Sequence, residues 1–165
     1  AMAARRGLSP RVSDLEDYGC TIGMGSDNMA EDMVEVMRTG LFMERIRREN
    51  GREPTPERAL RWATRNGYQA LGIKDGGWLA PGNKADLIVV DLQRAHLVPV
   101  LRVVSDFVHN GQARDVQSVM VDGKWLMKDG KVLVLDVETG RFEAYDAAVE
   151  AAHADAVLAG AGLMQ

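Results

Sequence analysis

The sequence is poor in the residues that build sulfur-based sites. Its 165 residues include one cysteine, Cys20, so no intrachain disulfide can form. A single cysteine also cannot form the paired-cysteine motif of a structural zinc site. We therefore expect a protein of a reducing, cytoplasmic setting.

Long apolar runs and an excess of positive charge are also missing. No stretch approaches the roughly 18 consecutive apolar residues that indicate a membrane-spanning helix. The chain has 20 Lys and Arg against 24 Asp and Glu, a net charge of −4, and its arginines are scattered among acids. This pattern lacks the basic surface that binds nucleic acid, so we expect neither a membrane nor a nucleic acid as a partner. With 46% hydrophobic residues, the composition is that of a folded globular protein.

Histidine is scarce as well. The 3 histidines are His96, His109 and His153, and no two of them have the i, i+4 spacing that places two metal ligands on one helical face. We therefore expect them to be surface or helix-capping residues.

Apolar spacing in the first half of the chain predicts mainly helices. A short helix over 9–19 precedes an apolar and β-branched run over 20–25, which predicts a strand. The strongest helical pattern covers 29–50. A capping Thr followed by Pro opens another helix over 55–72.

The second half has the period of a sheet. Residues 85–91 predict a buried strand, and two hairpin turns, Asp122-Gly123 and Asp129-Gly130, indicate a small antiparallel meander. The strands joined by these turns are expected at 116–121, 124–127 and 131–135. An Ala-rich stretch over 138–158 predicts a terminal helix.

Asp27 is the strongest candidate for chemistry. It follows the predicted strand at 20–25, and the carboxyl ends of strands in α/β proteins are where ligands and catalytic groups gather. Its neighbours Asn28 and Met29 are the candidates for contact with a substrate. The alternative is that Asp27 or Asn28 only caps the helix that follows, and the spacing leaves both interpretations open.

Other candidates have structural explanations. Glu31 and Asp32 could extend an acidic metal cluster, but two acids in a first helical turn are already explained by the helix dipole. The methionines of the same helix have the spacing of core residues, and the arginines of 45–48 are expected to form a solvated helix end. We interpret Trp62, Trp78 and Trp125 as packing anchors.

Four motifs, in order along the chain, resemble the amidohydrolase superfamily, in its cytosine deaminase and chlorohydrolase-like branch. They are Gly23-Met24-Gly25-Ser26-Asp27-Asn28, the helix over 59–67, the run Leu79 to Asp91, and Val119 to Lys124. The likeness extends from about Arg11 to Val134.

The resemblance implies an α/β fold that is only part of a larger one, since 165 residues fall short of the roughly 250 of a TIM-like (β/α)8 barrel. Residues 1–72 would be the last barrel strand and its flanking helices. Residues 73–137 would be the C-terminal part of a small β-sandwich, and 138–165 a C-terminal helix and tail.

The resemblance also implies an activity. Members of this family are metal-dependent hydrolases, which suggests hydrolysis of a non-peptide C–N bond of a small molecule, such as deamination of an aminated heterocycle by a metal-activated water. Asp27 matches the aspartate that binds or approaches one divalent metal, zinc or iron, and moves the proton of its water. The His-x-His pair and the middle-strand histidines of the family are absent here, and a catalytic metal needs about three protein ligands. We therefore expect the chain alone to be inactive and to lack a tightly held metal.

A different class of function stays open. The chain could be a non-catalytic structural or oligomerisation module, or a subunit that another chain completes. A barrel strand without neighbours leaves unpaired backbone groups, so we expect a homo-oligomer or a complex with the missing N-terminal barrel portion.

Overall fold

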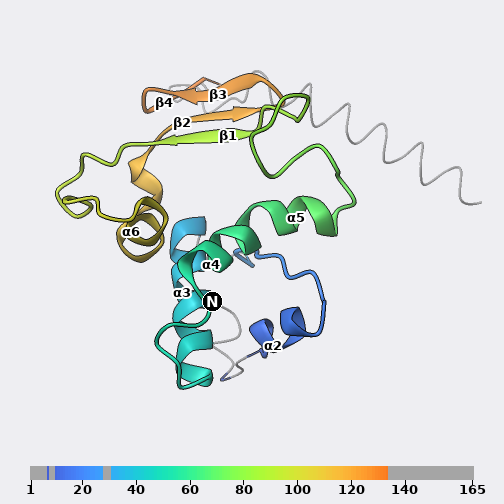
Figure 1. The fold of residues 1–165 in the computed structure, drawn as a ribbon. Helices are drawn as coiled ribbons and strands as arrows, with labels where there is room; N and C mark the ends of the chain where they lie inside the picture. Colours follow the sequence, from blue (N-terminus) through green and yellow to red (C-terminus); the bar gives the residue numbers. More distant parts are fainter. Residues whose placement is uncertain (1–6, 8–9, 28–30, 134–165) are drawn as a thin grey trace, which may run out of the picture.

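The computed structural model describes residues 7, 10–27 and 31–133. The helix expected over 138–158 lies outside these residues. The described part forms a group of helices and a four-stranded sheet (Figure 1). In that part of the chain, no helix combines the length and apolarity needed to cross a membrane.

Helices from both halves of the chain meet in one hydrophobic core. Most of them belong to the first half of the chain: α2 (Val12–Asp17), α3 (Met33–Arg47), α4 (Pro56–Ala63), α5 (Arg65–Ala70) and, beyond the first strand, α6 (Val103–Asn110). The core consists of the buried side chains Val34, Met37, Leu41, Ala59, Trp62, Phe107 and Val108. α3, α4 and α6 therefore pack against one another, and α3 and α4 are helices that the apolar spacing predicted.

Helix starts follow local chemistry. The side chain of Thr55 accepts a hydrogen bond from Arg58 N at 3.3 Å, with Pro56 at the first helical position, as the sequence predicted. The expected helix over 55–72 is nevertheless two helices. Thr64 has φ −128° and ψ −97°, which lies outside the helical region and separates α4 from α5.

The helix α6 is not among the elements expected from the sequence. No side chain caps its first residue, Val103, and its apolar stretch is short. It is held by Asp106, whose Oδ2 accepts the backbone N–H groups of Leu101 and Arg102, both at 2.8 Å. Tertiary packing of Phe107 and Val108 explains the helix better than local propensity does.

The sheet is the predicted antiparallel meander, in the order β1 (Leu87–Val90), β2 (Val116–Val121), β3 (Lys124–Lys128) and β4 (Lys131–Val132). Both hairpin turns, Asp122-Gly123 and Asp129-Gly130, have positive φ at both residues. This is the geometry that two-residue hairpins require.

The strand expected over 85–91 is present as β1, but it is not buried as expected. Ile88 and Val89 of β1 are 51% and 43% exposed, although they point to opposite faces of the sheet. A strand is buried on both faces only where layers cover both, and the described residues do not supply them.

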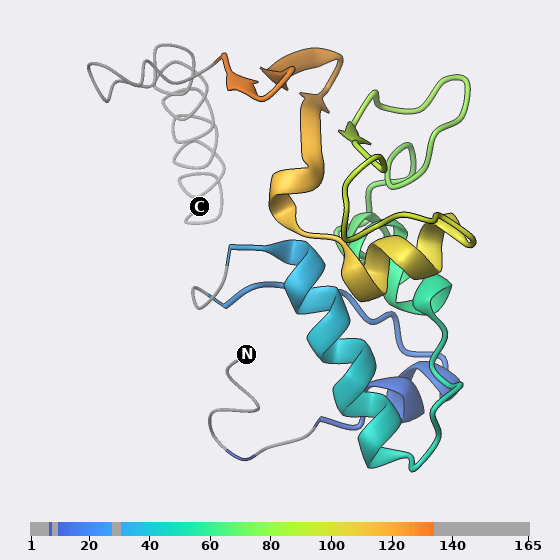
Figure 2. The same ribbon diagram turned by 90° about the vertical axis from the view of Figure 1, so that its left-hand side faces the viewer.

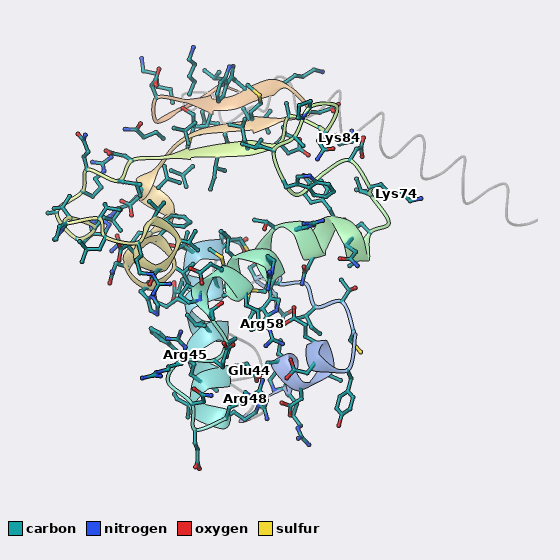
Figure 3. All side chains as sticks on the ribbon, in the orientation of Figure 1. Glu44, Arg45, Arg48, Arg58, Lys74 and Lys84 are labelled. Carbon is teal, nitrogen blue, oxygen red and sulfur yellow. The ribbon has the colours of Figure 1, made fainter. Side chains whose placement is uncertain are left out.

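Ion pairs attach α2 to α3 and α4. Arg47 donates to Asp14 at 3.1 and 2.8 Å, and Arg48 donates to Asp17 at 3.1 Å. Arg58 of α4 pairs with Glu16 and Asp17. Figure 3 shows Arg48 and Arg58 on the side of α3 and α4 that faces α2. The arginines at the end of α3 are therefore not a solvated helix end, contrary to the expectation from sequence.

Acid should weaken this attachment. Hydrogen bonds from Arg47 and Arg11 lower the pKa of Asp14 to about 2, whereas an unfolded aspartate titrates near about 3.9. The folded-state pKa is the lower one, so the contribution of Asp14 to stability is complete above about pH 5 and is lost as the pH falls toward about 2. We expect urea denaturation to give a falling free energy of unfolding over this range and a shallower fall for Asp14→Asn. Equal slopes would contradict the prediction.

Candidate active-site segment

The segment 20–26, which leads to Asp27, is extended (Figure 1) but is not a strand. This corrects the strand expected at 20–25, and the reason is physical: a strand is defined by backbone pairing with a neighbour, and the described residues supply none. One backbone hydrogen bond, from Met24 N to Trp62 O at 3.2 Å, holds the segment to α4. Ile22 and Met24 pack against the helical core.

Helix α3 has a close contact with this segment at a glycine. A Cβ atom at Gly40 would collide with the terminal methyl group of Met24. The absence of a side chain at Gly40 therefore leaves room for the end of the Met24 side chain against α3.

Asp27 is exposed and lies in a turn just beyond the extended segment. Its φ of 54° is in the left-handed region, which aspartate enters more readily than most residues. The structure does not place Asp27 at the start of α3, because Asp32 is the N-cap of that helix. Asn28, the other residue that could have been a cap, and Met29 lie outside the described residues.

Asp32 has a structural role that excludes it from a metal cluster. Its Oδ1 accepts hydrogen bonds from Val34 N at 2.8 Å and Glu35 N at 3.1 Å, and its Oδ2 accepts one from Ala113 N at 3.0 Å. Glu31 is exposed and accepts a long hydrogen bond of 3.5 Å from Ser26 Oγ. From sequence, Asp32 is expected in the first helical turn, but it is the N-cap, and an acid followed three residues later by Glu35 is the pattern of that position.

The described histidines form structural contacts. His96 Nε2 lies 2.8 Å from the buried carboxylate of Asp115. His109 Nδ1 lies 2.8 Å from Ser105 O, and its Nε2 lies 3.2 Å from the guanidinium of Arg45. His153 lies outside the described residues. Both described histidines are half-buried, so they are not simply surface residues, and His109 lies in the last turn of α6.

The described residues do not by themselves make a metal site. In that part of the chain, no group of three or more His, Cys, Asp or Glu side chains lies close enough to hold an ion. A catalytic zinc needs about three protein ligands and an open position for water. Asp27 alone does not meet this requirement.

The three tryptophans interpreted as packing anchors are not equally buried. Trp62 is 0% exposed, as expected of a packing anchor, and Met37 is buried in the core. Trp78 and Trp125 are 41% and 37% exposed. The guanidinium of Arg65 lies 4.5 Å from the centre of the Trp78 ring, so Trp78 supports a surface contact and is not a core anchor.

Comparison with known proteins gives a consistent family. Residues 2–126 match the amidohydrolase family. The chain is 38% identical over 141 residues to a 5-methylthioadenosine/S-adenosylhomocysteine deaminase from Pelotomaculum thermopropionicum, covering 83% of this chain and 32% of that protein. It is 36% identical over 153 residues to a 5'-deoxyadenosine deaminase from Methanosarcina barkeri, covering 90% of this chain and 35% of that protein.

Solved structures show the same fold in the matching part. An adenosine deaminase from Xanthomonas campestris with bound zinc matches with a TM-score of 0.74 at 24% identity, over 78% of this chain and 30% of that one. Atrazine chlorohydrolase from Arthrobacter aurescens, complexed with zinc, matches with a TM-score of 0.73 at 25% identity, over 83% of this chain and 32% of that one. The chain spans about one third of the length of these relatives. It belongs to the amidohydrolase family.

Proposed function

We propose that this chain is the C-terminal part of a metal-dependent amidohydrolase that hydrolyses a non-peptide C–N bond of a small molecule, deaminating an aminated heterocycle. Family membership supports the reaction class, and the relatives from P. thermopropionicum and M. barkeri are named as deaminases of adenosine derivatives. In this proposal, residues 1–72 supply helices and the segment 20–26, which would become the last barrel strand once neighbouring strands pair with it. Residues 73–137 supply a sandwich segment, and 138–165 supply a terminal helix and tail.

One observation carries the role of Asp27. Its carboxylate is exposed at the end of an extended segment that α3 and α4 hold in place, and Asp32 has taken the capping role that would otherwise explain it. We therefore assign Asp27 as one ligand of a divalent metal, zinc or iron, and as a proton acceptor in the complete enzyme. Asn28 and Met29 would contact the substrate.

The remaining ligands must come from other polypeptide. A metal of this kind supplies an activated water at neutral pH. In the described part of the chain, Asp27 has no partner ligands, so the site needs the N-terminal portion of a barrel, on the same chain or on another. The two zinc-containing structural neighbours favour zinc over iron.

The test is substitution of Asp27 in the complete enzyme, meaning the polypeptide that carries this chain together with the remaining two thirds of its relatives' length. We expect Asp27→Asn to lower kcat/KM for an adenosine-type substrate about 100-fold or more, because both the metal contact and the proton acceptor are altered. Bound zinc per protein should fall as well.

Glu31→Gln is the matched control, since it removes an exposed acid four residues further along. It should retain near-normal activity and zinc. Full activity and full zinc content in Asp27→Asn would refute the assigned role.

The extended segment 20–26 also favours a second candidate function, a non-catalytic module that pairs with another chain. Its backbone has no strand neighbour among the described residues and is open to pairing. Two measurements on the purified chain test the module. Stoichiometric zinc in an oligomer of this chain would show that copies complete the site and would count against a non-catalytic module, and a monomer at high dilution in sedimentation would count against pairing with another chain.

A further inference from the structure

Asp32 connects two parts of the fold that are far apart in sequence. One carboxylate oxygen caps α3, and the other accepts the backbone N–H of Ala113 at 3.0 Å, 81 residues along the chain. Ala113 begins the short 3-10 helix η1 (Ala113–Asp115), which joins α6 to β2. The start of α3 is therefore fastened to the connection between the helices and the sheet.

Arg38 reinforces this attachment with the opposite charge. Its Nε donates to Val108 O at 3.1 Å, and its Nη2 donates to Gly111 O, so it binds carbonyl groups at the end of α6. Asp115 holds the same connection from the other side, because its Oδ2 accepts Gln112 N at 2.8 Å. Figure 2 shows α3 running from this connection at its N-terminal end toward α2 at its C-terminal end.

Asp27 lies between two fixed points. On its N-terminal side, three residues before Asp27, the backbone N–H of Met24 donates a hydrogen bond to the carbonyl oxygen of Trp62. On its C-terminal side, among the described residues, the side chain of Asp32 is bonded to η1. Asp27 is therefore three residues from one attachment and five residues from the other.

We propose that Asp32 is a positioning residue of the active site. By accepting the Ala113 N–H it fixes where α3 begins, and so sets the place of Asp27 relative to the rest of the site. The idea rests on the proposed function for its effect on activity, but the hydrogen bond can be tested without it.

Three substitutions separate helix capping from the tie to Ala113. Asn and Ser both cap helices nearly as well as Asp. Neither replaces the second carboxylate oxygen: in Asp32→Asn an amide NH₂ faces Ala113 N–H, and in Asp32→Ser there is no second acceptor. Asp32→Ala loses the cap and the tie together. Glu35→Gln controls for loss of a first-turn charge, since the Glu35 side chain is exposed.

Amide hydrogen exchange of this chain measures the hydrogen bond between Ala113 N–H and Asp32 directly. We expect exchange at Ala113 to accelerate about tenfold or more in all three Asp32 variants, because an amide without its acceptor loses protection. Exchange at Val34 and Glu35 should accelerate only in Asp32→Ala. Unchanged exchange at Ala113 in every Asp32 variant would overturn the proposal.

Steady-state kinetics of the complete enzyme test whether Asp32 positions the active site. We expect kcat to fall between about 10-fold and 100-fold in Asp32→Asn and Asp32→Ser, with KM changed less than about twofold, because small displacements of a catalytic group act on the chemical step. Glu35→Gln should behave as the unsubstituted enzyme does.

If only Asp32→Ala lost activity, Asp32 would be no more than a helix cap and the proposal would be wrong. Fast exchange at Ala113 with an unchanged kcat would refute it too. Failure of the proposed function has a different signature, which is full activity in Asp27→Asn.

Discussion

Substitution of Trp62 by alanine should lower the free energy of unfolding by about 4 kcal/mol, as removal of a fully buried aromatic side chain usually does. Trp62 is 0% exposed and belongs to the core that joins α3, α4 and α6. Its indole Nε1 also donates to Glu16 Oε2 at 2.8 Å. The substitution therefore removes core volume and one attachment of α2 at the same time.

Two further variants divide this cost. Trp62→Phe keeps much of the volume but loses the N–H donor, so about 1 to 2 kcal/mol is expected. Trp125→Ala removes the same side chain from β3, where it is 37% exposed, and should cost less than half as much as Trp62→Ala. Chemical denaturation followed by circular dichroism measures all three. A loss below about 1 kcal/mol in Trp62→Ala would contradict the assignment of Trp62 to the core.

The same residue links the core to the candidate site. The carbonyl of Trp62 accepts the N–H of Met24, in the segment that leads to Asp27. A variant that loosens α4 should therefore also release this segment. In such a variant, amide exchange at Met24 should rise together with exchange in α4.

The features that sequence predicted are those set by residues close along the chain. Thr55 and Pro56 start α4, and Asp122-Gly123 turns β2 into β3, because each needs only a few neighbours to be satisfied. Two expected strands differ from the structure for the opposite reason. Pairing at 20–25 and burial of β1 depend on strands and layers that the described residues do not supply.

For the candidate site, the sequence indicated Asp27 but not the contacts that hold the neighbouring helices in place. Periodicity could not show that Asp32 bonds to Ala113, or that Arg47 pairs with Asp14 33 residues earlier. Long arginine side chains at a helix end are usually solvated, so the local pattern favoured the wrong interpretation. The acidic side chains of α2 pair with these arginines, and this pairing is visible only in the folded chain because the partners are far apart in sequence.

The second large effect is expected at Glu44, whose side chain is 2% exposed. Its carboxylate accepts hydrogen bonds from Ser13 N at 2.9 Å, from Ser13 Oγ, and from Arg47 at 2.9 and 3.0 Å. Burial alone would raise the pKa of Glu44, but the hydrogen bonds from Arg47 and Ser13 outweigh it and hold the pKa below its usual value. Glu44 is therefore an ionised, fully bonded carboxylate in the interior.

Glu44→Ala should lower the free energy of unfolding by about 3 kcal/mol, because it leaves buried donors without an acceptor. The expected value is at the lower end for a broken buried pair, since Arg47 keeps its bonds to Asp14. Glu44→Gln should cost less, because the amide oxygen can still accept from Ser13. Glu35→Ala, at an exposed position of the same helix, should stay within about 0.5 kcal/mol of the original chain.

A double-mutant cycle with Ser13→Ala distinguishes a specific contact from general packing. Residues that bond directly should show a coupling energy of about 1 kcal/mol or more. In that case Ser13→Ala costs little once Glu44 is gone, because its acceptor has already been removed. Additive losses would mean that α2 is held by its other ion pairs, through Arg47, Arg48 and Arg58, and that Glu44 stabilises α3 alone. The cycle therefore tests whether the helix that precedes the Asp27 segment is anchored through this buried carboxylate.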